Sequence, residues 1–98
     1  MDITRIGASA LIAAGQAVNM RANNIVNAQT PDYKPQAPVY APIVSGGGVA
    51  LFTQDVNGPV DTLRESVGMM AASQQYKAAA SIIRRSEDLA SAFLRAIG

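Results

Sequence analysis

Apolar residues recur at helical spacing through the first third of the chain. Leu11, Val18 and Ile25 stand one heptad apart, and Gly7 is among the small residues that accompany them. The pattern predicts a long helix over residues 3–28. Small residues let a neighbouring helix approach closely, but each glycine lowers helix propensity by up to about 1 kcal/mol relative to alanine. We therefore expect this helix to depend on packing.

A second helical pattern occupies the last third of the chain, over residues 62–96. Asp61 is placed to cap its N-terminus, and Glu65 lies in the first turn, where a negative charge suits the helix dipole. Its apolar residues form two stripes. The first contains Met69, Ala72, Tyr76, Ala79, Ile83, Ala90, Phe93 and Ile97, and the second contains Ala78, Ile82, Leu89 and Ala92. An antiparallel hairpin with the first helix buries one stripe, and the other needs another subunit or the middle of the chain.

The middle section, residues 30–59, holds all five prolines and a run of three glycines at 46–48, which excludes a helix. Residues 39–44 and 49–53 flank the glycines and are suited to pair as a short hairpin, with glycine supplying the positive φ of the turn. Pro42 favours an edge strand. A solvated linker without strand pairing fits the same residues.

These patterns predict a mainly α fold, in which long N- and C-terminal helices form an antiparallel coiled-coil hairpin. We divide the chain into an N-terminal helix of the coiled-coil core (1–29), an extended Pro/Gly-rich middle section (30–59) and a C-terminal helix of the core (60–98).

The composition indicates assembly. Charged residues make up 15% of the 98 residues and hydrophobic residues 49%, whereas an ordinary soluble domain is about 25% charged. A chain this small needs more charge than average to cover its surface, yet it has less, so part of that surface is expected to be buried against partners. The net charge of +1 gives no field that would gather nucleic acid.

Candidate chemistry is sparse. The chain has no cysteine and no histidine, and its carboxylates form no convincing pair, so we expect no catalytic, cofactor or metal site. Residues 6–20 carry no charge but are too short and too polar to span a bilayer, and no membrane insertion is expected. Asp2 beside Arg5 is not the basic cluster that begins a signal peptide, so any export is expected to occur without cleavage.

The most specific stretch is A-N-N-I-V-N-A-Q-T-P-D-Y-K, residues 22–34. Its three asparagines suit the end of a helix, because their amides compete with the helical hydrogen bonds. Pro31 restricts Thr30 to extended conformations, and Asp32 tolerates the turn that follows. Taken alone, this is equally well explained as an Asn-rich helix end with a proline stop.

The stretch closely resembles the signature of the flagellar rod and hook axial proteins, typically written A-N-N-I-A-N-A-x-T-P-G-Y-K. Only Val26 and Asp32 depart from it. The start of the second helix resembles the rod-protein pattern V-D-x-x-x-E-x-V-x-M-I-x-A-x-R-x-Y, with Gln74 in place of the usual Arg. The opening I-G-A-S-A-L and the short middle section are similar to the proximal-rod type, at an unusually small size.

This resemblance implies a structural subunit of the basal-body rod, spanning the periplasm, whose copies stack helically around the export channel and transmit torque. The implied partners are copies of itself, other flagellar rod subunits and the flagellar type III export apparatus. The expected motif and interface residues are Asn23, Asn24, Ile25, Asn27, Thr30, Pro31, Tyr33, Val67, Met70, Tyr76, Ile82, Ile83, Leu89 and Phe93.

Two other classes of protein remain open. One is a helical adaptor or chaperone-like binding module of a type III secretion system, which would never polymerise. The other is a peripheral membrane protein that uses an amphipathic helix, although the basic face of such a helix is missing.

Overall fold

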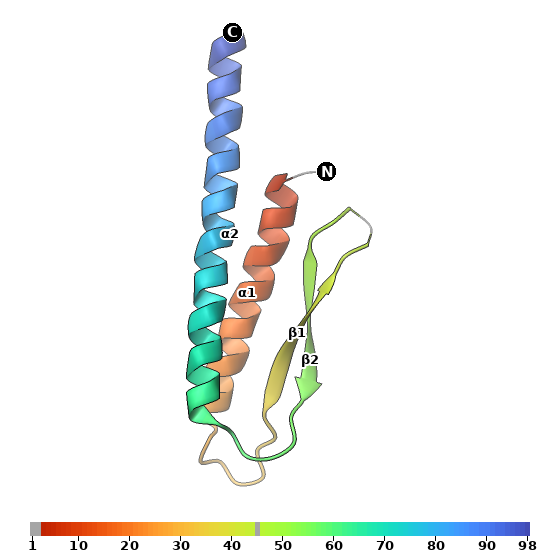
Figure 1. Cartoon of the computed structure of the whole chain (residues 1–98), viewed down its shortest axis with the longest axis vertical. Helices are drawn as coiled ribbons and strands as arrows, with labels where there is room; N and C mark the ends of the chain where they lie inside the picture. Colours follow the sequence, from red (N-terminus) through yellow and green to blue (C-terminus); the bar gives the residue numbers. More distant parts are fainter. Residues whose placement is uncertain (1–2, 45) are drawn as a thin grey trace.

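The fold is an elongated helical hairpin with a small sheet beside it (Figure 1). A computed structural model describes residues 3–44 and 46–98, in the order α1 (Ile3–Val26), β1 (Gln36–Pro42), β2 (Val49–Asp55) and α2 (Thr62–Ile97). The molecule measures 63 × 25 × 14 Å, and its radius of gyration is 17.1 Å, against about 13 Å for a compact chain of similar length. The mainly helical prediction is confirmed; residues 1 and 2 of the predicted N-terminal segment lie outside the described residues.

The two helices run antiparallel, as predicted (Figure 1). Near the start of α1, the hydroxyl oxygens of Thr4 and Ser86 lie 3.0 Å apart. Toward the end of α1, Arg21 Nη1 lies 3.2 Å from Glu65 Oε2. The contacts fix the direction of the helices, whereas the supercoiled packing of a coiled coil stays a prediction.

Small residues form the contact between the helices. Ile83 packs on Gly7 so closely that a Cβ added to the glycine would lie 3.0 Å from Ile83 Cγ1. Among the described residues, the buried apolar side chains are all alanines: Ala13, Ala14 and Ala17 from α1, and Ala72 and Ala79 from α2. Because an alanine buries little apolar surface, this contact provides less stability than a core of leucines would.

Helix α2 continues past the start of α1 (Figure 1). It contains 36 residues against 24 in α1, and beyond Ser86, which meets Thr4, every residue from 87 to 98 is exposed. At 1.5 Å per residue, residues 87–97 extend about 16 Å. We call these residues the α2 overhang.

The middle section forms the predicted hairpin, so the solvated-linker interpretation is wrong. Strands β1 and β2 pair antiparallel from Gln36↔Asp55 to Pro42↔Val49, and are longer than expected. Gly46, Gly47 and Gly48 have φ values of 84°, 76° and 98°, the left-handed values that glycine tolerates best.

Polar contacts attach the hairpin to both helices. Ser9 Oγ on α1 accepts a 3.0 Å hydrogen bond from the Val49 N–H, and the Tyr40 hydroxyl donates to Gln75 Oε1 on α2 at 3.1 Å. The hairpin therefore forms a second layer on the helices.

The helix ends agree closely with the sequence pattern. Asp61 caps α2 as predicted, because its Oδ1 accepts a 3.1 Å hydrogen bond from the Arg64 N–H. Helix α1 ends at Val26, two residues before the expected position 28; there the chain tightens, and the Ala28 N–H bonds to the Ile25 carbonyl three residues back. Within the described residues, no helix is both long enough and apolar enough to cross a membrane.

Candidate assembly site

Asn24 is the centre of the turn that follows α1. Its side chain is completely buried. Its Nδ2 donates to the Gln36 carbonyl at 2.7 Å, and its Oδ1 accepts from the Gln36 N–H at 3.3 Å and from the Tyr33 hydroxyl at 2.8 Å. The amide therefore pairs with both backbone groups of Gln36 where β1 begins, as a neighbouring strand would, and fastens the hairpin to the end of α1.

A second set of hydrogen bonds surrounds this centre. Asn23 Nδ2 donates to the Tyr33 hydroxyl at 3.1 Å, Asn27 Nδ2 donates to the Asn23 carbonyl at 2.9 Å, and Thr30 Oγ1 donates to Asn27 Oδ1 at 3.1 Å. Tyr33 is thus half-buried and hydrogen-bonded through its hydroxyl rather than free in solvent. Most polar residues of the signature thus hold one turn together, while their predicted role in an assembly interface stays a prediction.

The two departures from the signature occupy permissive positions. Asp32 has a φ of 60°, which is the left-handed conformation where the signature has glycine. Aspartate adopts this conformation more readily than most other residues with a side chain, so the same turn forms. Val26 is 80% exposed, and its bulk meets no steric limit within the subunit.

Sequence reasoning missed the ion pair between the helices. The carboxylate of Glu65 is almost fully buried beside Arg21, and the two side chains are 6% and 19% exposed. Gly68 makes room for Arg21, because a Cβ there would lie 2.6 Å from Arg21 Nε. The sequence pattern explains Glu65 only as an acidic residue in the first turn of the helix. The glutamate of the rod-protein pattern falls on this position, and this match was the one sequence feature that pointed to a further role.

The structure divides the predicted interface residues by exposure. Ile83 is half-buried between the helices, and Ile25 is also half-buried. The remaining apolar positions on α2 face solvent: Val67, Met70, Tyr76, Ile82, Leu89 and Phe93. Thr30 and Pro31 are exposed, and they belong to the connection between α1 and β1, which lies at the opposite end of the molecule from the overhang (Figure 1). Intramolecular packing therefore accounts for few of these residues.

The hairpin covers part of the second stripe of α2. A groove of about 360 Å³ is lined by Ala10, Tyr40, Val49, Gln75, Ala78, Ala79 and Ile82. Burial here raises the pKa of the Tyr40 phenol, and the positive charge of Arg21 offsets the increase in part. Of the two partners expected for this stripe, the middle section is the one present in the subunit, while Leu89 in the overhang has no cover from the described residues.

These features define a class of protein before any comparison. A thin two-helix hairpin, closed by an Asn-rich turn, leaves large apolar side chains uncovered, as is expected of a subunit of an assembly. A family model described as "Flagella basal body rod protein" matches residues 5–34, which include most of α1 and the whole signature turn. The predicted resemblance is confirmed over this segment, which is similar to the flagellar basal-body rod family. A search of curated proteins gave no significant match.

This match supports a structural role in the flagellar basal body, with other rod components as the expected partners. The family is a structural component of the flagellum, and it favours this role over the adaptor interpretation.

Proposed function

We propose that this chain is a rod subunit that polymerises helically with like subunits around the export channel and transmits torque. The observation that carries the proposal is the α2 overhang. It presents Leu89, Phe93, Leu94 and Ile97, each more than 60% exposed, on a helix end that α1 does not reach.

The spacing of these side chains suits a neighbouring helix. Leu89, Phe93 and Ile97 follow one another at intervals of four, so they lie along one face of α2. Fully burying one such side chain contributes about 1.5–3 kcal/mol. We infer that the overhang docks on a different surface of the next subunit, and a contact of this kind repeats without closing when the rotation between subunits does not complete a ring. Such contacts generate the helical filament that a rod requires.

The remaining features of the subunit suit the same role. The alanine contact between α1 and α2 is thin, so burial between subunits is expected to supply much of the rigidity that torque requires. A subunit that is only weakly stable alone also passes more easily, unfolded, through a narrow secretion channel. We accordingly place it in the rod across the periplasm, delivered by the flagellar type III export apparatus without a cleaved signal peptide.

The test separates folding from assembly with two substitutions on α2. Phe93→Asp changes an exposed overhang residue, so the purified monomer should keep the circular dichroism and melting behaviour of the wild type. Rod assembly and swimming should be lost, because burying an unpaired carboxylate between subunits costs several kcal/mol. Phe93→Leu is the matched control and should retain both.

Ile83→Asp should instead destabilise the fold of the monomer, since Ile83 of α2 packs on Gly7 of α1. Normal swimming by Phe93→Asp would contradict the proposed polymer contact. Protein that stays monomeric at high concentration while export still proceeds would support the adaptor role instead.

A further inference from the structure

The hairpin has an outer edge on each strand, and its register shows which backbone groups lie there. The Ile43 N–H bonds to the Gly48 carbonyl and the Val56 N–H bonds to the Pro35 carbonyl, so odd-numbered residues of β1 bond inward to even-numbered residues of β2. The backbone N–H and C=O groups of even-numbered residues of β1 and of odd-numbered residues of β2 therefore point away from the partner strand, toward the outer edges of the sheet. The contacts of Gln36 with Asn24 and of Val49 with Ser9 agree with this alternation.

The outer edge of β1 is closed to another strand. Its outward residues are Gln36, Pro38, Tyr40 and Pro42. Both backbone groups of Gln36 are bonded to Asn24, and the two prolines have no N–H. Tyr40 alone keeps an N–H that a strand could use, and proline on an edge is a common device against strand addition.

The outer edge of β2 is open. Val49 is bonded to Ser9, but the next outward residues, Leu51, Thr53 and Asp55, have no backbone partner among the described residues. Thr53 and Asp55 are also exposed. This edge therefore offers a row of N–H and C=O groups beginning at Leu51, with no proline or bulge to protect it.

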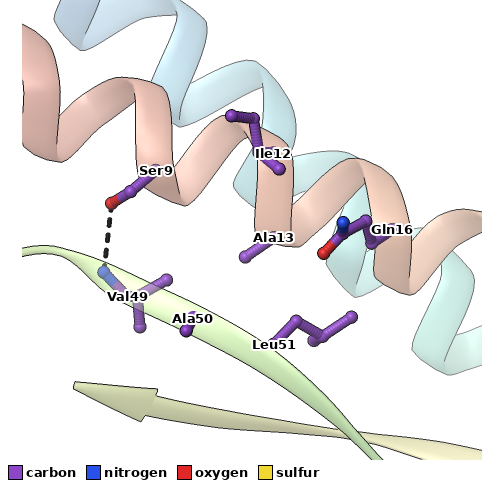
Figure 2. A pocket seen from close by; sticks show the side chains of 7 residues that line it. All are labelled: Ser9, Ile12, Ala13, Gln16, Val49, Ala50 and Leu51. Atoms are coloured by element: carbon purple, nitrogen blue, oxygen red, sulfur yellow. Dashed lines mark hydrogen bonds between the residues drawn. The ribbon is translucent and has the colours of Figure 1, made fainter. Parts of the chain in front are cut away.

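An apolar groove lies beside the open edge. It has a volume of about 280 Å³ and is lined by Ser9, Ile12, Ala13, Gln16, Val49, Ala50 and Leu51. Figure 2 shows Ile12, Ala13 and Gln16 of α1 above the strand that carries Val49 and Leu51. The paired residues Val39 and Phe52 are also exposed, at 39% and 59%. In the isolated subunit, the outer edge of β2 therefore lacks a hydrogen-bonded strand, and part of the apolar surface of the sheet is uncovered.

We propose that β2 accepts an added strand along Leu51–Asp55, and that this strand is an extended segment of a different subunit of the rod. The proposal deepens the proposed function and depends on it. Backbone hydrogen bonds would hold the strand, with small or apolar side chains over the groove and a basic side chain near Asp55.

The choice of occupant follows from the closed edge. In a polar stack of identical subunits, joining hairpins head to tail would pair β2 of one copy with β1 of the next, and that edge is blocked by Asn24, Pro38 and Pro42. Pairing β2 with β2 of a second copy needs a two-fold axis, which a stack with one direction lacks. Neither strand of a second copy therefore fits this edge, and we assign the added strand to a chain that is not a copy of this one.

Thr53→Pro tests the open edge, because it removes an outward N–H and leaves the inward bonds of the β1–β2 pair intact. The facing residue is Pro38, so the hairpin already contains proline at an outward position of this pair. We expect Thr53→Pro to lose rod assembly and motility, while Thr53→Val, which keeps the N–H, retains both. Assembly of normal rods by Thr53→Pro would overturn the proposal.

Amide exchange in purified basal bodies is the second measurement, and it needs no substitution. The amides of Leu51, Thr53 and Asp55 should exchange slowly in the rod and fast in the monomer, while the amide of Tyr40 on the closed edge should stay fast in both. Fast exchange at Thr53 in assembled rods would contradict strand addition.

A single cysteine tests whether the occupant is β2 of a second copy, since the chain has no cysteine of its own. If β2 paired with β2 about Thr53, the two Cα atoms would lie about 5.5 Å apart, within disulfide range. Oxidised rods of Thr53→Cys should therefore contain no dimer of this chain, and a disulfide-linked dimer would overturn the choice of a different subunit. Rods that form normally when the whole chain is deleted would refute the proposed function itself, which distinguishes its failure from that of the strand.

Discussion

Arg21 Nη1 and Glu65 Oε2 lie 3.2 Å apart and tie the last turns of α1 to the first turn of α2. The pair lies at the end of the helical hairpin from which the chain enters the sheet, opposite the end that carries the α2 overhang (Figure 1). Because mainly small residues pack between the helices, this pair and the contact between Thr4 and Ser86 are polar links that fix how the helices meet.

Removing one partner of this pair should destabilise the monomer. Arg21→Met leaves the buried Glu65 carboxylate without its cation, so we expect a loss of about 2–3 kcal/mol, below the full cost for a buried pair because Arg21 is 19% exposed. Glu65→Gln, which leaves no buried negative charge, should cost less. Urea unfolding measures both, with Arg64→Met as an exposed control. An equal effect of Arg21→Met and Arg64→Met would contradict the assigned role.

Replacing Asn24 should weaken the attachment of the β1–β2 hairpin to α1. Asn24→Ala leaves the Gln36 backbone and the Tyr33 hydroxyl without their partner, and we expect a loss of about 2–3 kcal/mol. Tyr33→Phe should cost about 1 kcal/mol, because it removes one hydrogen-bonding group only. Thermal and urea unfolding provide the values. Asn23→Ala, at an exposed position, is the control, and a loss as large as that of Asn24→Ala would show that burial does not decide the effect.

The sequence predicted the elements well because their signals are local. Helical spacing located both helices, Asp61 was recognised as a cap, and the glycines at 46–48 located the turn of the hairpin. The asparagines of the signature were recognised as belonging to a helix end, and Asp32 as a residue that accepts a left-handed turn. Each of these inferences needed only neighbours in the sequence.

The long-range contacts could not be predicted in the same way. The partners Arg21 and Glu65, or Tyr40 and Gln75, lie 44 and 35 residues apart, and no local pattern joins them. The signature residues were assigned to an assembly interface because of their specificity, yet Asn24 is used inside the subunit. Which edge of the hairpin is open also depends on register, and register is set by the completed turn.

Alkaline pH should weaken the attachment of the hairpin through Tyr40. Burial raises the pKa of this phenol above its ordinary value of about 10, so the folded state favours the neutral form that donates to Gln75. This contribution to stability is fully present below the unfolded pKa and is lost as the pH rises through the higher, folded pKa. Phenolate absorbance and unfolding as functions of pH should show the loss for the wild type. Tyr40→Phe should lack this component, and an unchanged alkaline profile would show that the phenol is not its source.

The last prediction concerns where the isolated subunit is ordered. Its buried apolar side chains are Ala13, Ala14 and Ala17 of α1 and Ala72 and Ala79 of α2, so amide exchange in a dilute monomer should be slowest around them. The α2 overhang packs on nothing within the described residues, and an isolated helical segment of its length is marginal in water. Its amides should exchange fast in the monomer and slowly in assembled rods, where neighbouring subunits cover Leu89 and Phe93. Phe93→Asp should leave the monomer pattern unchanged. Slow exchange through the overhang of a dilute monomer would mean that the helix end is stable without neighbours, and would remove the energetic reason for its burial in a polymer.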